Sequence, residues 1–288
     1  MSESKKLSYI LKLLDDDSPV VRKSLVNELV AFGLSLHEEL TRLNPPPTLW
    51  QRQQLQELMA EYHRRELRTV WPRWFEITDE YLRLEKALGL LSEFQTGLIY
   101  AACASGLLDE LADEFRRAVK PQDAYELAQF LFKTKGLKGD QTDYYNPLNS
   151  SLVYVLKEKK GIPLSLSCIY MLVARRVGLT VEGCNLPGHF MAKTVFHGQT
   201  ILVDCFNGGR FLDPREVLKV NVEVTAEIKQ IIEKKTTVEA IILRYLNNLI
   251  RAFEGTHNLA GSQLMTELVR MIEEYWANKT QDTRTRDT

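Results

Sequence analysis

The sequence has few cysteines, almost no net charge and no long apolar segment, and each absence narrows what the protein can be. Its four cysteines, Cys103, Cys168, Cys184 and Cys205, form no C-x-x-C pair, so neither a disulfide framework nor a metal site is expected. The 37 basic residues nearly balance the 38 acidic ones, which removes the overall attraction to nucleic acid and anionic membranes. No segment of ~18 residues is free of charge, and no apolar leader with a cleavage site is present. We therefore expect a cytoplasmic protein with reduced thiols, no cofactor, and neither a nucleic-acid nor a membrane partner.

The remaining composition is that of an ordinary globular protein. Hydrophobic residues make up 44% of the 288 residues and charged residues 26%, which excludes a long disordered, collagen-like or low-complexity chain. A chain of this length buries a sizeable core and corresponds to one large domain or two ordinary ones.

Residues 1–92 are expected to form an all-helical N-terminal region. Apolar residues recur there at helical spacing, and Ser18 with Pro19 opens a second amphipathic segment that Gly33 ends. The segment 7–33 is similar to one HEAT-type repeat, with an acidic turn followed by a proline at the helix start. Because repeat arrays need about three units to close a core, an ordinary helical hairpin is the alternative interpretation.

The pattern changes in the second half of the chain. Residues 136–150 are dense in turn formers, and residues 161–179 then form a mostly apolar segment whose only charges lie in its last turn. This segment predicts a central, buried helix. Three short β-like segments follow, and the second and third, 189–196 and 200–206, are expected to form a hairpin. Residues 226–276 predict an antiparallel helical pair, followed by a tail too polar to pack.

A buried helix followed by short strands that carry a histidine and an aspartate is the element order of papain-like acyl-transfer enzymes. In such enzymes a cysteine at the helix N-terminus is the nucleophile, because the helix dipole lowers its pKa. A histidine on a neighbouring strand is the base, and an aspartate or asparagine orients it. Here His189 begins the second β-like segment and Asp204 lies at the end of the third. We expect the hairpin to bring the two side chains into contact.

The residues around this pattern resemble the transglutaminase-like core of the bacterial SirB family, over roughly residues 90–255. The resemblance is carried by Asn149-Ser150, Gly161-Ile162-Pro163, Leu186-Pro187-Gly188-His189-Phe190 and Asp204 through Gly209. It implies an α+β, transglutaminase-like (papain-like) fold, with a small antiparallel sheet, a buried central helix and helical, often tetratricopeptide-like, flanks. It does not imply transglutaminase activity.

The resemblance also implies a departure at the nucleophile. In the wider superfamily a Gly-x-Cys motif opens the buried helix and an Arg-x-x-Gly motif ends it. Aligning Arg175 or Arg176 and Gly178 with that pattern places Pro163 where the catalytic cysteine should be. Proline suits a first helical turn but offers neither a nucleophile nor an N–H group to an oxyanion.

Ser167 is the best substitute nucleophile by helix geometry. It lies four residues after Pro163, on the same face and one turn deeper, so a Ser167, His189 and Asp204 triad is one interpretation. The other is a small hydroxyl that bonds back to a carbonyl or holds His189 in place. His189 is likewise either a general base or a structural residue that joins two strands.

Other candidates flank this constellation. Asn149 precedes the buried helix and is the candidate oxyanion donor or positioning residue, although a helix cap or a loop clasp would explain it equally. Phe206, Asn207 and Gly208 belong to a glycine-containing turn that could present N–H groups to a ligand or simply permit positive φ. Together with Gly188 they are the candidate ligand-binding residues.

Two cysteines also flank the site in sequence. Cys184 or Cys205 could supply a relocated thiol, but strand alternation points Cys205 away from the face that Asp204 shares. Together with His189 and Asp204 they could imitate a zinc site, but the spacing typical of zinc ligands is absent.

We expect three regions: helical residues 1–92, a transglutaminase-like core at 93–222, and a C-terminal helical hairpin with a polar tail at 223–288. The favoured function is a non-catalytic or regulatory module that binds a protein or peptide partner. The alternative is an atypical amide or ester hydrolase, or an acyl transferase, that uses the Ser167 triad. The sequence leaves open whether the protein is an enzyme.

Overall fold

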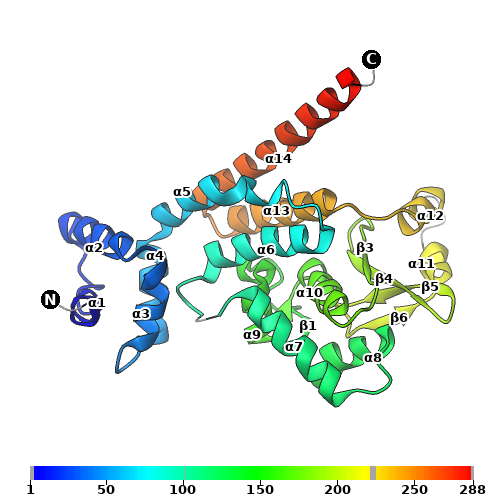
Figure 1. Cartoon of the computed structure of the whole chain (residues 1–288), viewed down its shortest axis with the longest axis horizontal. Coiled ribbons are helices and arrows are strands. Elements are labelled where there is room, and N and C mark those ends of the chain that lie inside the picture. The colour runs from blue at the N-terminus through cyan, green and yellow to red at the C-terminus, as the bar shows by residue number, and fades with distance from the viewer. Residues whose placement is uncertain (1–2, 101, 221–224, 287–288) are drawn as a thin grey trace.

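The computed structural model describes residues 3–100, 102–220 and 225–286. It is mainly helical, with two small sheets (Figure 1). The helices are α1 Glu3–Ile10, α2 Pro19–Ala31, α3 Leu36–Arg42, α4 Leu49–Leu58, α5 Ala60–Val70, α6 Glu80–Thr96, α7 Ala104–Ala118, α8 Ala124–Gln129, α9 Leu152–Glu158, α10 Pro163–Arg176, α11 Pro214–Val220, α12 Thr225–Glu233, α13 Val238–Gly255 and α14 Leu259–Arg286. The strands are β1 Lys138–Gly139, β2 Lys160–Gly161, β3 Glu182–Cys184, β4 Met191–Phe196, β5 Gln199–Asp204 and β6 Arg210–Leu212. None of the helices in the described ranges combines the length and hydropathy that a bilayer span requires.

The N-terminal helices have a hydrophobic cluster of their own. Helices α1 to α4 contribute buried leucines to it, and Leu98, just after α6, is the distant member. Pro19 is the first residue of α2, as the sequence predicted. After the three prolines at 45–47, Thr48 and Gln51 form a capping box that begins α4. In Figure 1 helices α1 to α3 lie at one end of the molecule and the four-stranded sheet lies at the other.

Helix α10 is the centre of the main core, as its apolar sequence predicted. Residues 163–174 are all buried. One hydrophobic cluster joins α10 to α6, α7, α9, α13 and α14, so the C-terminal helical pair shares the core with the central helix. Arg176 ends α10 and binds Glu85 of α6 (Nη1 to Oε2, 2.8 Å) and Asp109 of α7 (Nε to Oδ1, 2.5 Å).

The main sheet is antiparallel, with the strand order β3-β4-β5-β6. Strands β4 and β5 form the predicted hairpin, in which Phe196 pairs with Gln199. The turn residues His197 and Gly198 both have positive φ, at 48° and 76°, as a tight hairpin turn requires. Strand β6, which the sequence analysis missed, has only three residues. The other sheet is a parallel pair, β1 and β2.

Some expected element boundaries were wrong. Helix α6 runs to Thr96, and α7 begins at Ala104. The expected boundary between residues 92 and 93 therefore lies inside a helix. Helix α14 continues through the polar tail to Arg286, because that segment contains neither proline nor glycine to end a helix.

Candidate functional site

His189 and Asp204 are in contact, as the hairpin predicted. His189 lies in the loop that leads into β4, and Asp204 is the last residue of β5. The distance from His189 Nε2 to Asp204 Oδ1 is 3.0 Å. Asn207 also binds Asp204: its backbone N–H donates to Asp204 Oδ1 (3.2 Å), and its Nδ2 donates to Asp204 Oδ2 (2.7 Å). The His189 side chain is 31% exposed and that of Asp204 is 9% exposed.

This hydrogen bonding keeps Asp204 charged. Burial alone raises the pKa of the carboxyl group, but the hydrogen bonds from His189 and Asn207 outweigh burial and hold the pKa below its usual value. A carboxylate in this position fixes the orientation of the imidazole ring. Within the described ranges no hydrogen bond engages the other ring nitrogen, Nδ1, which can therefore form one with a ligand.

The glycine turn after Asp204 is held by internal contacts. Gly208 and Gly209 have φ values of 80° and 71°, and the Gly209 N–H donates to Asp204 O (2.9 Å). A Cβ atom on Gly209 would lie 2.4 Å from the ring of Phe132. Positive φ and close packing therefore account for Gly209, and its N–H group is not available to a ligand.

Strand β1 connects this turn to the start of α10. The Gly139 N–H donates to Phe206 O (3.1 Å), and the Asp140 N–H donates to Gly161 O (2.9 Å). A Cβ atom on Gly139 would lie 2.5 Å from the ring of Phe206. The backbone of β1 thus fills the space between the turn that carries Asp204 and the segment that leads into Pro163.

Helix α10 begins at Pro163, which is buried. The Ser165 hydroxyl caps this end, since it accepts a hydrogen bond from Ile162 N (3.1 Å) and donates to Asn149 O (2.7 Å). Asn149 is fully buried, and its Nδ2 donates to Asp143 O (2.7 Å). These contacts are those of a loop clasp, one of the two interpretations of Asn149.

Ser167 does not lie where a nucleophile must. Its side chain is 0% exposed and contacts the thiol of Cys205, and no hydrogen bond joins it to His189 within the described ranges. Helix periodicity correctly placed it one turn below Pro163, but a deeper turn of a central helix is enclosed by the core. The geometry lacks the solvent-connected nucleophile that the Ser167 triad requires.

The thiols of the core are inert by burial. Burial raises the pKa of Cys205 to about 12, although the Ser167 hydroxyl opposes the shift, and it raises the pKa of Cys184 to about 11. Burial also raises the pKa of Cys168. Such thiols stay protonated and are poor nucleophiles. Cys103 is exposed, at the start of α7. In the described part of the chain no three His, Cys, Asp or Glu side chains are grouped as metal ligands would be.

An aromatic row beside His189 was missed by the sequence analysis. The ring centroids of Tyr145 and Tyr144 are 5.3 Å apart, those of Tyr144 and Phe206 are 6.0 Å apart, and those of Phe206 and His189 are 6.3 Å apart. Tyr145 is 68% exposed and Tyr144 is 39% exposed. The available signal was two consecutive tyrosines in a loop otherwise made of polar turn formers.

Arg244 of α13 supports the loop that carries His189. Its Nη1 donates to Leu186 O (2.7 Å) and to Asn185 Oδ1, and its guanidinium lies 5.6 Å from the ring centroid of Phe190. Burial lowers its pKa.

The region that holds this site is similar to known proteins. The family model described as the transglutaminase-like superfamily matches residues 103–247, which include α10, the sheet and Arg244. No solved structure matches the chain.

The curated relatives are bacterial and animal proteins. A UPF0162 protein of Xylella fastidiosa strain Temecula1 is 30% identical over 153 residues, 51% of this chain and 54% of the relative. A second, from strain 9a5c, is 28% identical over 200 residues, 65% of this chain and 71% of the relative. The mouse protein F-box only protein 21 is 31% identical over 129 residues, 42% of this chain but 20% of that protein. The chain thus spans about half the length of the first relative and a fifth of the mouse protein.

Proposed function

The chain belongs to the transglutaminase-like superfamily, and on that premise we propose that it is a member without the cysteine nucleophile. Its role in this proposal is to bind a protein or peptide segment on the surface around His189. The closer kinship with SirB-type proteins and a cytoplasmic location are parts of the same proposal.

The observation that carries the proposal is the start of α10. Its first residue is Pro163, which we align with the nucleophile of the superfamily. Proline supplies neither a thiolate nor an N–H group to that end of the helix. The thiols nearest in sequence to His189 and Asp204, those of Cys184 and Cys205, are fully buried. The His189 and Asp204 pair is therefore flanked in sequence by buried thiols, which supports a member of the superfamily without a cysteine nucleophile.

The aromatic row supports binding at this surface. Tyr145, Tyr144, Phe206 and His189 form a continuous series of ring contacts, with Asn207 exposed beside it. Tyrosine side chains combine a large apolar area with a polar end and are enriched among the residues that dominate binding energy. Gly188 is exposed next to His189 and leaves room for the main chain of a bound segment.

The alternative function, an atypical amide or ester hydrolase or acyl transferase built on Ser167, receives no such support. Ser167 would have to leave its contact with Cys205 and reach solvent before it could attack a carbonyl group.

A peptide selection tests the binding proposal. Peptides are selected from a random library on the immobilised full chain, and their affinities for the parent, Tyr145→Ala and Tyr9→Ala are measured by fluorescence anisotropy. Tyr9 is the matched control, because it is a 60% exposed tyrosine on α1. We expect Tyr145→Ala to weaken binding at least about tenfold, the typical effect of losing an aromatic anchor, and Tyr9→Ala to leave it unchanged.

Two results would contradict the proposal. One is a set of peptides that bind Tyr145→Ala as tightly as the parent. The other is cleavage or acylation of a peptide, detected by mass spectrometry, that His189→Ala abolishes, since this would establish an enzyme.

A further inference from the structure

Two positively charged side chains border the aromatic row without a carboxylate to balance them. They are Lys133, in the π-helical turn Phe130–Thr134 after α8, and Arg244 of α13. Complementary charges across an interface determine which partners are accepted and which are rejected. The charges of these two residues therefore indicate what a segment bound around His189 must carry.

Lys133 lies over the glycine turn that follows Asp204. It is exposed, and its ammonium nitrogen lies 3.0 Å from the position that a Cβ atom on Gly208 would take. The preceding residue, Phe132, packs against Gly209 and so fixes the turn beneath the lysine. Neither Lys133 nor Arg210, the exposed residue directly after the turn, forms a side-chain hydrogen bond or an ion pair in the part of the chain that the structure describes. The turn is therefore bordered by unbalanced positive charge.

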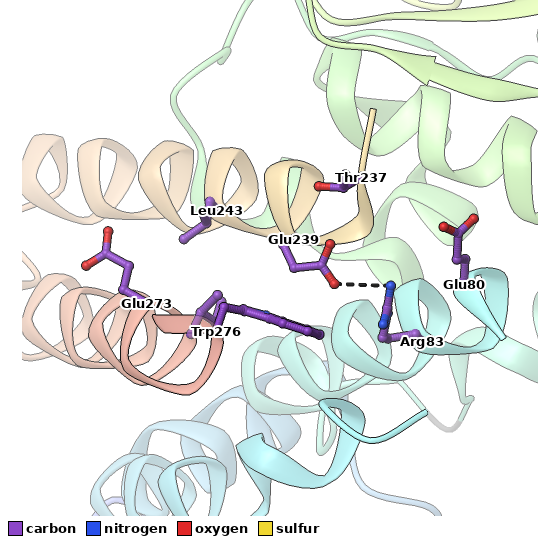
Figure 2. Close-up of a pocket in the computed structure, with 8 residues that line it drawn as sticks. Glu80, Arg83, Thr237, Glu239, Leu243, Glu273 and Trp276 are labelled. Atoms are coloured by element: carbon purple, nitrogen blue, oxygen red, sulfur yellow. Dashed lines mark ion pairs between the residues drawn. The ribbon is translucent and has the colours of Figure 1, made fainter. Parts of the chain in front are cut away.

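Arg244 is a partly buried arginine without a carboxylate. Elsewhere in the helical core, Arg83 of α6 forms an ion pair with Glu239 of α13 (Nη2 to Oε1, 3.1 Å; Figure 2), and Arg176 binds carboxylates of α6 and α7. Arg244 lies on the same helix as Glu239 but forms no ion pair with any residue in the described ranges. Since a charge held partly out of water is costly without a partner, a ligand that supplies a carboxylate would stabilise it.

The guanidinium of Arg244 has one edge free of hydrogen bonds. Nη1 is used by Leu186 O and Asn185 Oδ1, whereas Nε and Nη2 have no partner among the described residues and are not buried. These two N–H groups lie side by side and match the two oxygens of one carboxylate. The charge acts on the aromatic row, because burial raises the pKa of Tyr144 and Arg244 opposes that rise. Arg244 can therefore bind a carboxylate beside Tyr144.

The carboxylates that flank the aromatic row in sequence already have donors from the chain. Asp204 accepts from His189 and Asn207. Asp143, in the loop after β1, accepts from Asn146 Nδ2 (3.0 Å). The groups of this surface that are left for a charged ligand are thus the cations.

We propose that the segment bound around His189 is acidic. One Asp or Glu carboxylate of a partner protein binds the Nε and Nη2 edge of Arg244, a second binds Lys133, and an apolar side chain of the same segment packs on the aromatic row. This inference rests on the proposed binding function and names the chemistry of its partner. A neutral or basic segment would leave both cations without a counter-charge.

The probes for this inference are the peptides that the random-library selection yields and that lose affinity in Tyr145→Ala. Each peptide is compared with an amide version, in which every Asp is replaced by Asn and every Glu by Gln. We expect Asp and Glu to be enriched among the selected sequences. The amide versions should bind at least about threefold more weakly by fluorescence anisotropy, the effect of one partly exposed charge pair.

Lys133→Met removes one of the two cations and keeps an unbranched stem. It should weaken binding of the acidic peptides about threefold and leave the amide versions unaffected. Lys12→Met is the matched control, because it removes the same charge from an exposed lysine just after α1, at the other end of the molecule from the sheet (Figure 1). This control should bind both kinds of peptide as the parent does.

Arg244 needs a pair of variants, because it also supports the loop before His189. Arg244→Lys and Arg244→Gln both lose the two-pronged edge, but only the lysine keeps the charge. We expect Arg244→Lys to bind the acidic peptides at least about threefold more tightly than Arg244→Gln does. The two variants should bind the amide versions equally, which separates the charge from any change in the loop.

The outcomes separate this inference from the binding proposal on which it rests. Peptides that need Tyr145 but are not enriched in Asp and Glu, or that bind as tightly in their amide versions, would overturn the acidic segment and leave the binding surface intact. The same holds if Lys133→Met behaves as Lys12→Met does, or if the two Arg244 variants bind the acidic peptides alike. A selection that yields no Tyr145-dependent peptide contradicts both.

Discussion

Replacing Lys193 with methionine is expected to lower the free energy of unfolding by about 3 kcal/mol, as when one partner of a buried ionic contact is removed. Lys193 lies on β4, and its side chain is only 8% exposed. Its ammonium group donates to Ile232 O (2.8 Å) and Lys234 O (2.7 Å), at the end of α12, and lies 3.6 Å from Glu182 Oε2. The lysine therefore caps the C-terminus of α12, where carbonyl groups lack helical partners.

Methionine keeps an unbranched apolar stem but leaves those carbonyls without their donor and removes the cation near Glu182. Urea unfolding measures the loss, and hydrogen exchange should show faster opening of α12. Lys229→Met is the control, because Lys229 lies on α12 with 65% of its side chain exposed and, among the residues that the structure describes, forms an ion pair with Glu233 alone, at 3.9 Å. If Lys193→Met lies within about 0.5 kcal/mol of this control, the usual range of surface substitutions, Lys193 does not anchor α12.

Acid should destabilise the protein through His63. Burial lowers the pKa of His63 to about 4, against about 6.5 in an unfolded chain. Between these values the unfolded state binds a proton that the folded state excludes, so stability falls as pH decreases from about 6.5 to about 4, by up to about 3 kcal/mol. Above about pH 6.5 the residue is neutral in both states and contributes no pH dependence.

The surroundings of His63 explain where this destabilisation acts. Nδ1 of the ring lies 3.3 Å from Gln56 Nε2, which also donates to Phe94 O (2.8 Å). Gln56 Oε1 accepts from Leu98 N (3.0 Å), so the amide group joins α4 to α6 and the segment after it. A charged imidazole would repel the Nε2 donor and loosen this junction.

Thermal unfolding of His63→Asn at a series of pH values tests whether His63 causes the loss of stability in acid. The asparagine oxygen can accept from Gln56 but does not titrate, so the loss of stability below pH 6.5 should largely disappear. His257→Asn is the control, because His257 is exposed and has a φ of 58°, which asparagine tolerates well. An unchanged acid profile in His63→Asn would contradict the assignment.

The parts of the fold that the sequence predicted are those with strong local signals. The hairpin of β4 and β5 follows from β-like segments around His197 and Gly198, and α10 follows from the apolar segment 161–179. Contact between His189 and Asp204 is a consequence of that hairpin. In each case neighbouring residues carry the information.

The parts that the sequence did not predict depend on contacts between distant segments. Ser167 lies on the expected helix face, but its burial depends on what packs over α10. The row from Tyr145 to Phe206 joins the loop after β1 to the turn after β5. No periodicity of the sequence indicates such a contact between distant segments.

Pro163→Cys directly tests the proposal that Pro163 stands at the nucleophile position of an acyl-transfer site. Alkylation of the introduced thiol by iodoacetamide is followed against pH by peptide-resolved mass spectrometry, in Pro163→Cys and in Pro163→Cys with His189→Ala. Cys103, exposed in the same chain, is the internal reference.

We expect a thiol pKa below the ordinary value of about 8.5, against the rise that burial of position 163 alone would cause, because the start of α10 and the His189 imidazole both favour the thiolate. Removal of His189 should reverse most of that shift. An introduced thiol that titrates normally, or that reacts at the same rate with and without His189, would contradict the claim.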